Sequence, residues 1–500
     1  MKKVLATMLT AGLLSASLFG CGSAPEGSAD VNENNDPAPV EQESEAGTET
    51  PEETEAEAPE ETETPEAASG EISADTVATL KLAGPGLFTD VGENGSTDLV
   101  TGEMKPGYKE VIDRWNELYP NITIEVETAP WDNWQAYLQT AALSGDVDIL
   151  LHGASITDTA EPLEPYLEKD PEIKEQMSML AVRKNDKVTS YKDFVTYGVS
   201  ITTNSIVVVI DTKILEDWGV EIPDKNWTLQ DMKDIAKACT GTNPVTGKQT
   251  YGISLIKSSQ TEKNFIWASR AMNDTVFEYA DTVKDTKVNF DTDKTKEVLN
   301  YLAEFYQYSN PDYIEGLDLG NAYTAENDLA MVIVENGYGS YNQIKVNGQE
   351  DHYMFLQLPA IQGGQYDGVS ASHMGDFNLA ICNTSQQKDL AWEFIKFMAT
   401  DDFVQKWLVE AKVVPSNIEG VKYLKDVMPA EFYTPLQEIA DNYDPMFSLQ
   451  ANDSYNSIEF GNFSGNVGAV LNEMYMGNMT ADEAAADVQA KVDEYLSSLQ

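Results

Sequence analysis

Positively charged residues are scarce in this chain of 500 residues, which has 32 Lys and Arg against 84 Asp and Glu and a formal net charge of −52. A phosphate backbone needs a cationic partner, so this balance excludes nucleic acid as an expected partner. It also argues against a polybasic protein that lies on an anionic membrane surface. Only three histidines and three cysteines are present, and their spacing matches no metal-binding motif. We therefore expect no metal site and no cofactor.

The three cysteines are too few and too widely separated to form a disulfide framework. Cys239 follows Met232 and Ile235 at helical spacing, which predicts a buried thiol on a helix. A bridge between Cys239 and Cys382 stays open as the alternative. The remaining cysteine, Cys21, ends the N-terminal segment and has a different interpretation.

Long hydrophobic runs are also rare, and the clearest one opens the chain. Lys2 and Lys3 precede an apolar stretch, Val4 to Phe19, that is too short to span a bilayer comfortably and is soon followed by Cys21. This pattern resembles a bacterial lipoprotein signal, in which the cysteine becomes the lipidated first residue of the mature chain. Residues 1–21 are therefore predicted to be a lipoprotein signal peptide, and the exported protein is predicted to be anchored by lipid to the outer face of the cytoplasmic membrane. An ordinary secretory signal with an incidental cysteine is the alternative.

Residues 22–76 form an acidic segment that contains no Lys or Arg. Its Glu, Pro, Ala and Ser residues bury too little apolar surface to offset the entropy lost on ordering, so we predict a disordered linker. Repulsion between like charges extends such a linker further. Its expected role is to hold the folded body away from the membrane, and a calcium-binding or partner-binding tail is the alternative.

The rest of the chain alternates between strand patterns and helix patterns. Strands are predicted over 77–83, 122–126, 147–151, 205–210 and 377–382, and helices over 108–118, 132–143, 228–239, 390–398 and from 480 onward. Continuous apolar strands such as 147–151 are typical of a parallel sheet with both faces covered. This order predicts an α/β protein, and the length of the chain predicts two packed units.

Several segments in this order resemble the family 1 extracellular solute-binding proteins, whose best-known relatives bind maltose and other oligosaccharides. The segments are Trp115–Pro120, Trp131–Asp148, Asp217–Thr228, Ala330–Tyr338, Leu358-Pro359 with Gly375 and Ala391–Phe394, and Gly477–Ala486. Two positions depart from the family's pattern. Tyr338 stands where the family usually has Trp, and Gly375-Asp376 stands where paired glycines are common.

The resemblance implies the type II periplasmic binding protein fold, an α/β architecture of two lobes with a ligand cleft between them. An N-terminal lobe of residues 77–200 plus 359–400 and a C-terminal lobe of residues 201–358 plus 401–500 are expected. The resemblance also implies the substrate-binding lipoprotein of an ABC importer. Such a protein is a monomer that captures a sugar or oligosaccharide by hinge closure and delivers it to a membrane permease without catalysing a reaction.

A sugar site needs aromatic rings for the apolar faces of the sugar and polar groups for its hydroxyls. Trp131 and Trp134 flank the start of a helix near a strand end, where open α/β sheets bind ligands, and His152 follows a strand. Core packing is the alternative for the tryptophans, and a metal between His152 and His373 is not expected. The predicted ligand-binding residues are Trp131, Trp134, His152, Gly153, Ser155, Trp267, Arg270, Glu335, Asn336, Tyr338, His373, Gly375 and Asp376.

Two other functions stay open at this point. A solute-binding protein for an anionic, non-sugar ligand would need Arg or Lys near its site, and Arg270 is the candidate. An exported glycan hydrolase would need a pair of carboxylates in a cleft. The sequence contains no Gly-x-Ser-x-Gly, His-Glu-x-x-His or phosphate-loop motif, so we expect no enzyme activity.

Overall fold

A computed structural model of the chain describes most of the body. The described residues are 72, 76–130, 134–152, 159–178, 180–183, 195–256, 261–274, 276–278, 285, 287–314, 321–364, 366–372, 374–442 and 463–499. Residues from Thr76 to the C-terminus belong to one compact unit. The predicted signal peptide, its Cys21 and nearly all of the acidic segment lie outside the described residues. No helix in the described ranges combines the length and hydrophobicity that a membrane crossing requires.

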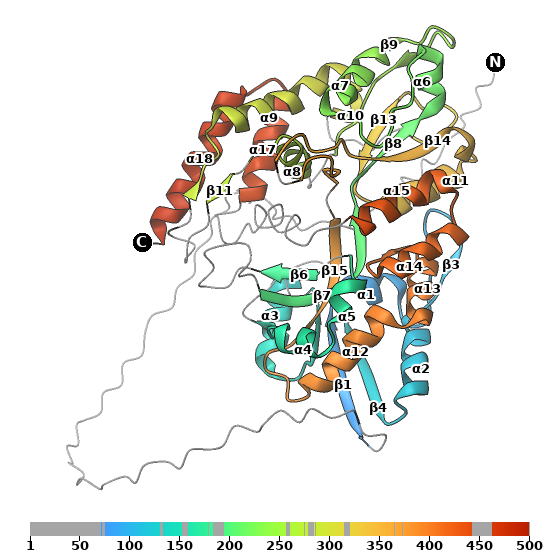
Figure 1. The fold of residues 1–500 in the computed structure, drawn as a ribbon, viewed down its shortest axis with the longest axis vertical. Coiled ribbons are helices and arrows are strands. Elements are labelled where there is room, and N and C mark those ends of the chain that lie inside the picture. The colour runs from blue at the N-terminus through green and yellow to red at the C-terminus, as the bar shows by residue number, and fades with distance from the viewer. Residues whose placement is uncertain are drawn as a thin grey trace, which may run out of the picture. The chain divides into compact units, whose positions relative to one another are not determined.

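The first sheet has seven strands in the order β16-β7-β15-β5-β1-β4, with β6 paired to β7 (Figure 1). These strands are β1 (Ala78–Gly84), β4 (Ile122–Thr128), β5 (Ile149–Leu151), β6 (Leu180–Arg183), β7 (Val195–Ser205), β15 (Met374–Ile381) and β16 (Val414–Pro415). β1 pairs in parallel with β4 and β5, whereas β15 pairs antiparallel with β5 and β7. The parallel pairing of β1 with β4 and β5 agrees with the parallel sheet predicted from the alternating strands and helices at the start of the body.

Several helices of the chain pack against strands of the first sheet. These helices and their neighbours are α1 (Leu87–Val91), α2 (Tyr108–Leu118), α3 (Trp134–Ser144), α4 (Glu164–Lys169), α5 (Glu172–Gln176), α12 (Lys388–Thr400) and α13 (Asp402–Glu410). Trp115 of α2 is fully buried, and its indole donates to the carbonyl oxygen of Ile122 at 3.0 Å. Its ring meets Phe394 and Phe397 of α12 edge to face. The apolar spacing of α2 therefore marks its core face, as its periodicity predicted.

The second sheet is a three-stranded antiparallel sheet in the order β13-β8-β14. Its strands are β8 (Val207–Asp211), β13 (Met331–Val334) and β14 (Tyr353–Gln357). Successive side chains of β8 point to opposite faces, as the pleat of a strand requires. Val208 and Ile210 join one hydrophobic cluster, and Val207 and Val209 join another. Both faces of β8 are therefore core, which explains its continuous apolar sequence.

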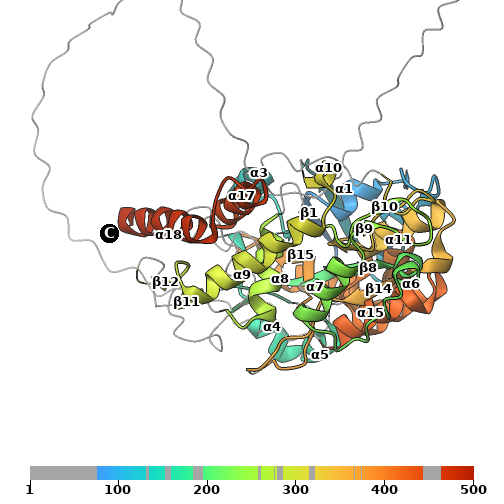
Figure 2. The same ribbon diagram turned by 90° about the horizontal axis from the view of Figure 1, so that it is seen from above.

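Two sets of helices supply these two cores. The Val208–Ile210 face is covered by α7 (Leu229–Ala238), α8 (Glu262–Ala271), α9 (Asp293–Glu304), α17 (Phe463–Tyr475) and α18 (Ala481–Ser498). α17 packs against α8 and α18, and α18 packs against α9 (Figure 2). The opposite face is covered by α11 (Gly337–Val346), α14 (Ile418–Val421) and α15 (Ala430–Asp441). The capping boxes predicted at Thr228 and Thr480 are both formed, with Asp231 and Glu483.

Smaller elements complete the described chain. They are α6 (Thr212–Trp218), α10 (Pro311–Ile314), the 3-10 turns η5 (Phe305–Tyr308), η6 (Glu350–His352) and η7 (Lys422–Asp426), and the strand pairs β2 (Ser96–Thr97) with β3 (Met104–Lys105), β9 (Gly241–Thr242) with β10 (Gln249–Thr250), and β11 (Phe277–Glu278) with β12 (Lys287–Val288). Cys239 and Cys382 are free, buried thiols, so the bridge between them is not formed.

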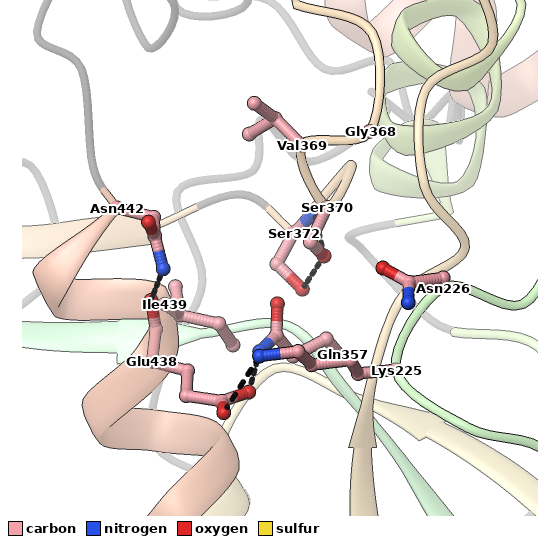
Figure 3. Close-up of a pocket in the computed structure, with 10 residues that line it drawn as sticks. All are labelled: Lys225, Asn226, Gln357, Gly368, Val369, Ser370, Ser372, Glu438, Ile439 and Asn442. Atoms are coloured by element: carbon pink, nitrogen blue, oxygen red, sulfur yellow. Dashed lines mark hydrogen bonds and ion pairs between the residues drawn. The ribbon is translucent and has the colours of Figure 1, made fainter.

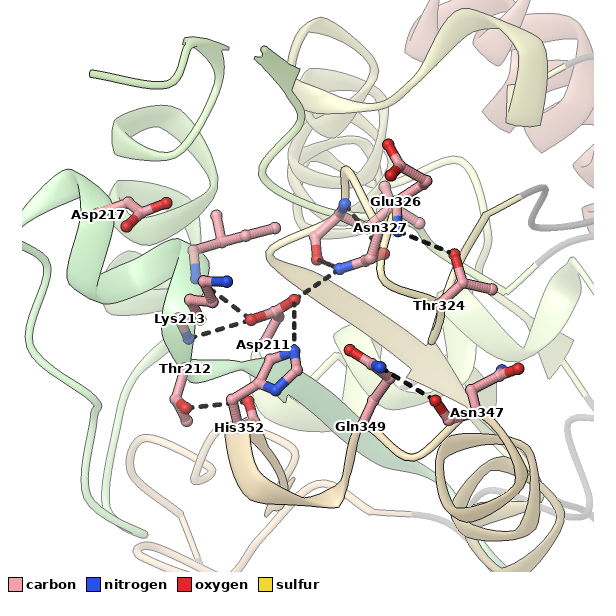
Figure 4. A network of polar contacts seen from close by, with 12 residues as sticks. Asp211, Thr212, Lys213, Asp217, Thr324, Glu326, Asn327, Asn347, Gln349 and His352 are labelled. Carbon is pink, nitrogen blue, oxygen red and sulfur yellow. Dashed lines mark hydrogen bonds and ion pairs between the residues drawn. The ribbon is translucent and has the colours of Figure 1, made fainter. Parts of the chain in front are cut away.

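A buried carboxylate fixes the outer end of the second sheet. Asp211 caps α6 by accepting from the amides of Lys213 and Ile214 at 3.0 and 3.2 Å (Figure 4). Its other oxygen accepts from the side chain of Asn327 at 2.8 Å, and His352 Nε2 lies 3.9 Å away. Burial raises the pKa of Asp211, and these hydrogen bonds oppose the rise. The network has a structural role, because it joins β8, α6 and the loop before β13.

Two connections between the sheets run next to each other. β7 passes through Ile206 directly into β8, so the predicted strand 205–210 is divided between two sheets at this point. The return connection leads from β14 to β15, and its Ser372 hydroxyl donates to the carbonyl oxygen of Ile206 at 2.8 Å. β16 and the last residues of β7, which the sequence assigned to the C-terminal lobe, pair within the first sheet.

Candidate functional site

Part of the predicted site cannot be placed. Trp131, Gly153, Ser155 and His373 lie outside the described residues. Gly375 and Asp376 belong to β15, where they pair with Asn204 and Thr203 of β7. These two positions therefore lie on the strand pair that leads from the second sheet into the first.

The structure brings Trp134 and His152 together at the carboxyl end of β5. Their ring centroids are 5.7 Å apart, and the His152 ring meets Phe377 of β15 edge to face at 4.8 Å. The amide of His152 donates to the carbonyl oxygen of Asn378 at 2.8 Å, and its φ of 61° is the left-handed conformation that a sharp turn after the strand requires. Both side chains are almost fully buried. Burial lowers the pKa of His152 to about 3, so the imidazole is neutral at neutral pH.

Glu335 is part of a charged cluster at the end of β13. Lys263 Nζ of α8 lies 2.8 Å from Glu335 Oε1, and both side chains are about one-quarter exposed. Burial raises the pKa of Glu335, and the charge of Lys263 opposes this. The neighbouring Glu262 is also affected: burial raises its pKa to about 7, against the attraction of Lys263. α17 approaches Glu262 closely, since a Cβ at Gly468 would lie 3.2 Å from its carboxylate.

Neither Glu262 nor Lys263 was predicted from the sequence pattern. Both lie in the first turn of an amphipathic helix, where charged residues usually form a solvated face. Glu335 stands at the end of a predicted strand, but nothing in the sequence indicates that α8 starts beside this strand end. Only the packing of α8 against the second sheet joins these three residues.

Asn336 and Tyr338 act within α11. Asn336 caps this helix by accepting from the amide of Gly339 at 2.8 Å. Tyr338 is 2% exposed, and its hydroxyl donates to the carbonyl oxygen of Val409 at 3.0 Å. The structure thus gives Tyr338 a packing contact, and contact with a ligand stays a prediction for both residues.

Trp267 and Arg270 lie on α8 but have different surroundings. Trp267 is 0% exposed, with its indole 3.4 Å from Asn264 Oδ1 and its ring edge to face with Tyr301. This favours the core-packing alternative for Trp267. Arg270 Nη1 donates to the carbonyl oxygen of Ser372 at 3.4 Å, so its side chain reaches the return connection between the sheets.

The two aromatic residues expected at one ligand surface are not brought together. Trp267 belongs to the hydrophobic cluster on the Val208–Ile210 face of β8, whereas Tyr338 belongs to the cluster on the Val207–Val209 face. The two rings therefore pack in different cores, on opposite faces of β8. Glu335, Asn336 and Arg270 are described polar candidates that stay partly exposed. Within the described ranges, His, Cys, Asp and Glu side chains form no group of three that could hold a metal.

Comparison with known proteins matches this architecture. Residues 101–405 match the model of a family described as bacterial extracellular solute-binding protein. No curated protein sequence matches the chain. The family match covers more than half of the chain and includes strands of both sheets. It confirms the resemblance indicated by the sequence motifs.

Solved structures share the fold at low identity. The sugar-binding protein MalE from Xanthomonas citri has a TM-score of 0.63 and 16% identity, over 84% of this chain and 98% of that one. A sugar transporter from Rhizobium etli in an open conformation has a TM-score of 0.60 and 14% identity, over 83% and 98%. A solute-binding protein from Agrobacterium vitis S4 with bound D-mannitol has a TM-score of 0.54 and 16% identity, over 85% and 99%. The two-lobe fold expected from the sequence is thereby confirmed.

Proposed function

The chain belongs to the bacterial extracellular solute-binding protein family, and from this premise we propose that it captures a sugar or sugar alcohol for an ABC importer. The observation that carries the proposal is the family match over residues 101–405, which includes strands of both sheets and the two connections described between them. One lobe is built around the first sheet and the other around the second. Ligand between the lobes stabilises a closed state, which a membrane permease then recognises.

The charges of His152 and of the Lys263–Glu335 pair favour a neutral ligand. His152 is neutral, and the positive charge of Lys263 faces Glu335 at 2.8 Å. Such groups offer hydrogen bonds to hydroxyls without an unbalanced positive charge, which a phosphate or dicarboxylate ligand would need. Proteins of the same fold carry D-mannitol and maltose in their structures, which supports this ligand class. The protein releases its ligand unchanged, so no catalytic residue is assigned.

The N-terminal sequence supports a lipid anchor. Cys21 follows a short apolar stretch with two lysines before it, and lipidation there would hold the exported protein at the outer face of the membrane. The acidic segment that follows would act as a spacer. Mass spectrometry of the protein from its native membrane tests this: a diacylglyceryl group on an N-terminal Cys21 supports the anchor, and an unmodified or absent Cys21 contradicts it.

Thermal-shift screening against a panel of sugars, sugar alcohols, phosphates and dicarboxylates tests the ligand class. A ligand at 100 times its Kd stabilises the folded state by about 2.7 kcal/mol, which raises the melting temperature. We expect a rise with at least one sugar or sugar alcohol and none with the anions. Stabilisation by an anion alone, or hydrolysis of a glycan in the same sample, would reject the proposal.

A further inference from the structure

A pocket lies at the edge of the second sheet that carries β14. It encloses about 720 Å³ of non-atom space, a volume that includes open solvent at its mouth. The residues that line it are Lys225, Asn226, Gln357, Gly368, Val369, Ser370, Ser372, Glu438, Ile439 and Asn442 (Figure 3). They come from the loop before α7, the end of β14, the return connection and the end of α15.

This pocket is separate from the charged cluster around Glu335. Gln357 and Val334 both pair with Val207, but they do so from opposite sides of β8. The end of β13 at Val334 and the end of β14 at Gln357 are therefore about two strand spacings, or about 10 Å, apart. No lining residue comes from the first sheet or its described helices. Among the described residues, a molecule in this pocket thus contacts the second lobe and the return connection.

The charged groups of the pocket balance each other. Glu438 Oε1 lies 3.2 Å from Lys225 Nζ, and Glu438 Oε2 accepts from the side-chain amide of Gln357 at 2.7 Å. Because Gln357 donates its N–H to this carboxylate, its carbonyl oxygen turns toward Ser370 and Ser372 (Figure 3). Glu438 would repel an anionic ligand, and Lys225 would repel a cationic one. A neutral ligand experiences neither repulsion.

The remaining polar groups suit a ligand that donates several hydrogen bonds. The Ser372 hydroxyl donates to the carbonyl oxygen of Ile206 and also accepts from Ser370 and from the amide of Leu358. The side-chain carbonyl oxygen of Gln357 and the carboxylate of Glu438 therefore serve as acceptors for a ligand at the rim of the pocket. Val369 and Ile439 add a small apolar wall that fits the C–H groups of a carbon chain.

From this chemistry we propose that the pocket is a second binding site, for a small neutral polyol, distinct from the interlobe site of the proposed function. Hydroxyl groups of the polyol donate to Glu438 and Gln357 and accept from Lys225, while its carbon chain lies on Val369 and Ile439. The pocket does not depend on closure of the lobes, because the first sheet contributes none of its walls.

Trp227 provides a local reporter. It is 3% exposed, and its indole donates to the backbone carbonyl oxygen of Gln357 at 2.8 Å. The protein is labelled with 5-fluorotryptophan, and the resonance of Trp227 among the eight tryptophans is assigned with Trp227→Phe. Glycerol, ribitol and D-mannitol are then titrated, and ¹⁹F spectra are recorded. We expect a saturable shift of the Trp227 resonance with at least one of the three.

Substitutions in the pocket separate direct binding from lobe closure. Glu438→Ala removes the main acceptor and is expected to weaken this binding about tenfold, the loss of one hydrogen bond to a charged group. Lys225→Met, at an exposed side chain, should weaken it similarly without touching the core. Glu431→Ala, on the exposed first turn of the same helix, should leave it unchanged.

The outcomes are distinct from those of the proposed function. Binding between the lobes is followed at the Trp134 resonance, which the pocket variants should not alter. A Trp227 shift that is absent with all three polyols, or that persists equally in Glu438→Ala and Lys225→Met, would overturn the second site. Loss of the Trp134 response alone would count against the interlobe site and leave the second site standing.

Discussion

The hydroxyl of Tyr338 donates to the backbone carbonyl oxygen of Val409 at 3.0 Å, and this bond joins elements that belong to different sheets. Tyr338 lies on α11, which follows β13 of the second sheet. Val409 lies on α13, whose Trp407 donates to the carbonyl oxygen of Gly107 at the start of α2. Tyr338 therefore couples the second sheet to a helix that is held on the first. Tyr338, which was predicted to contact the ligand, thus also has a structural contact between elements of the two sheets.

Tyr338→Phe tests this link. The Val409 carbonyl oxygen also accepts from the amide of Lys412, so removal of the hydroxyl does not leave it without a donor. We expect a loss of about 1 kcal/mol in the free energy of unfolding, measured by urea denaturation. Tyr433→Phe on α15 is the control. A stability equal to that of the unchanged protein would show that the bond contributes nothing.

His152 predicts a dependence of stability on acid pH. Its folded-state pKa of about 3 lies below the ordinary value of 6.5, so the unfolded chain binds more protons between these values. The contribution of the neutral imidazole is present above pH 6.5 and is lost as the pH falls toward 3. His152→Gln should therefore show a smaller fall in unfolding free energy between pH 7 and pH 5. Parallel pH profiles of the two proteins would contradict the burial of a neutral imidazole.

Glu262 predicts the opposite trend at higher pH. Its folded-state pKa of about 7 lies above the ordinary value of 4.5, so the folded chain binds more protons in this window. Its contribution to stability is fully present below pH 4.5 and falls as the pH rises through 7. Glu262→Gln should be equal to the unchanged protein near pH 4 and more stable than it at pH 8. Glu431→Gln, an exposed acid, serves as the control and should show no such divergence.

Lys263 tests whether the charged cluster is part of the ligand site. Lys263→Met leaves Glu335 without its cation in a largely buried position, which should raise the pKa of that carboxyl further. We expect sugar affinity, measured by calorimetry, to fall about tenfold, because the positions of both side chains change. Lys233→Met breaks a pair of similar exposure with Glu304 on other helices and should leave affinity intact. Equal affinities in both variants would move the ligand site away from α8.

Local sequence patterns were sufficient where a residue's neighbours along the chain decide its structure. The apolar spacing of α2 placed Trp115 in the core, and the Thr228 and Thr480 caps began their helices as predicted. The run 205–210 was different, because an apolar stretch does not reveal whether it serves one sheet or two. Ile206 is the point where the chain passes from β7 to β8, and only the pairing partners of each strand show this.

The sequence by itself determined the family, the two-lobe fold and most helix and strand positions, since these depend on periodicity, capping and segment order. Tertiary structure alone decided which aromatic candidates are packed in a core. An aromatic residue on an apolar helix face fills a core or lines a site according to what covers it, and Trp267 and Tyr338 are covered on opposite sides of one sheet. The pair of Lys263 with Glu335 likewise exists only because α8 packs beside the end of β13, a contact between distant parts of the chain.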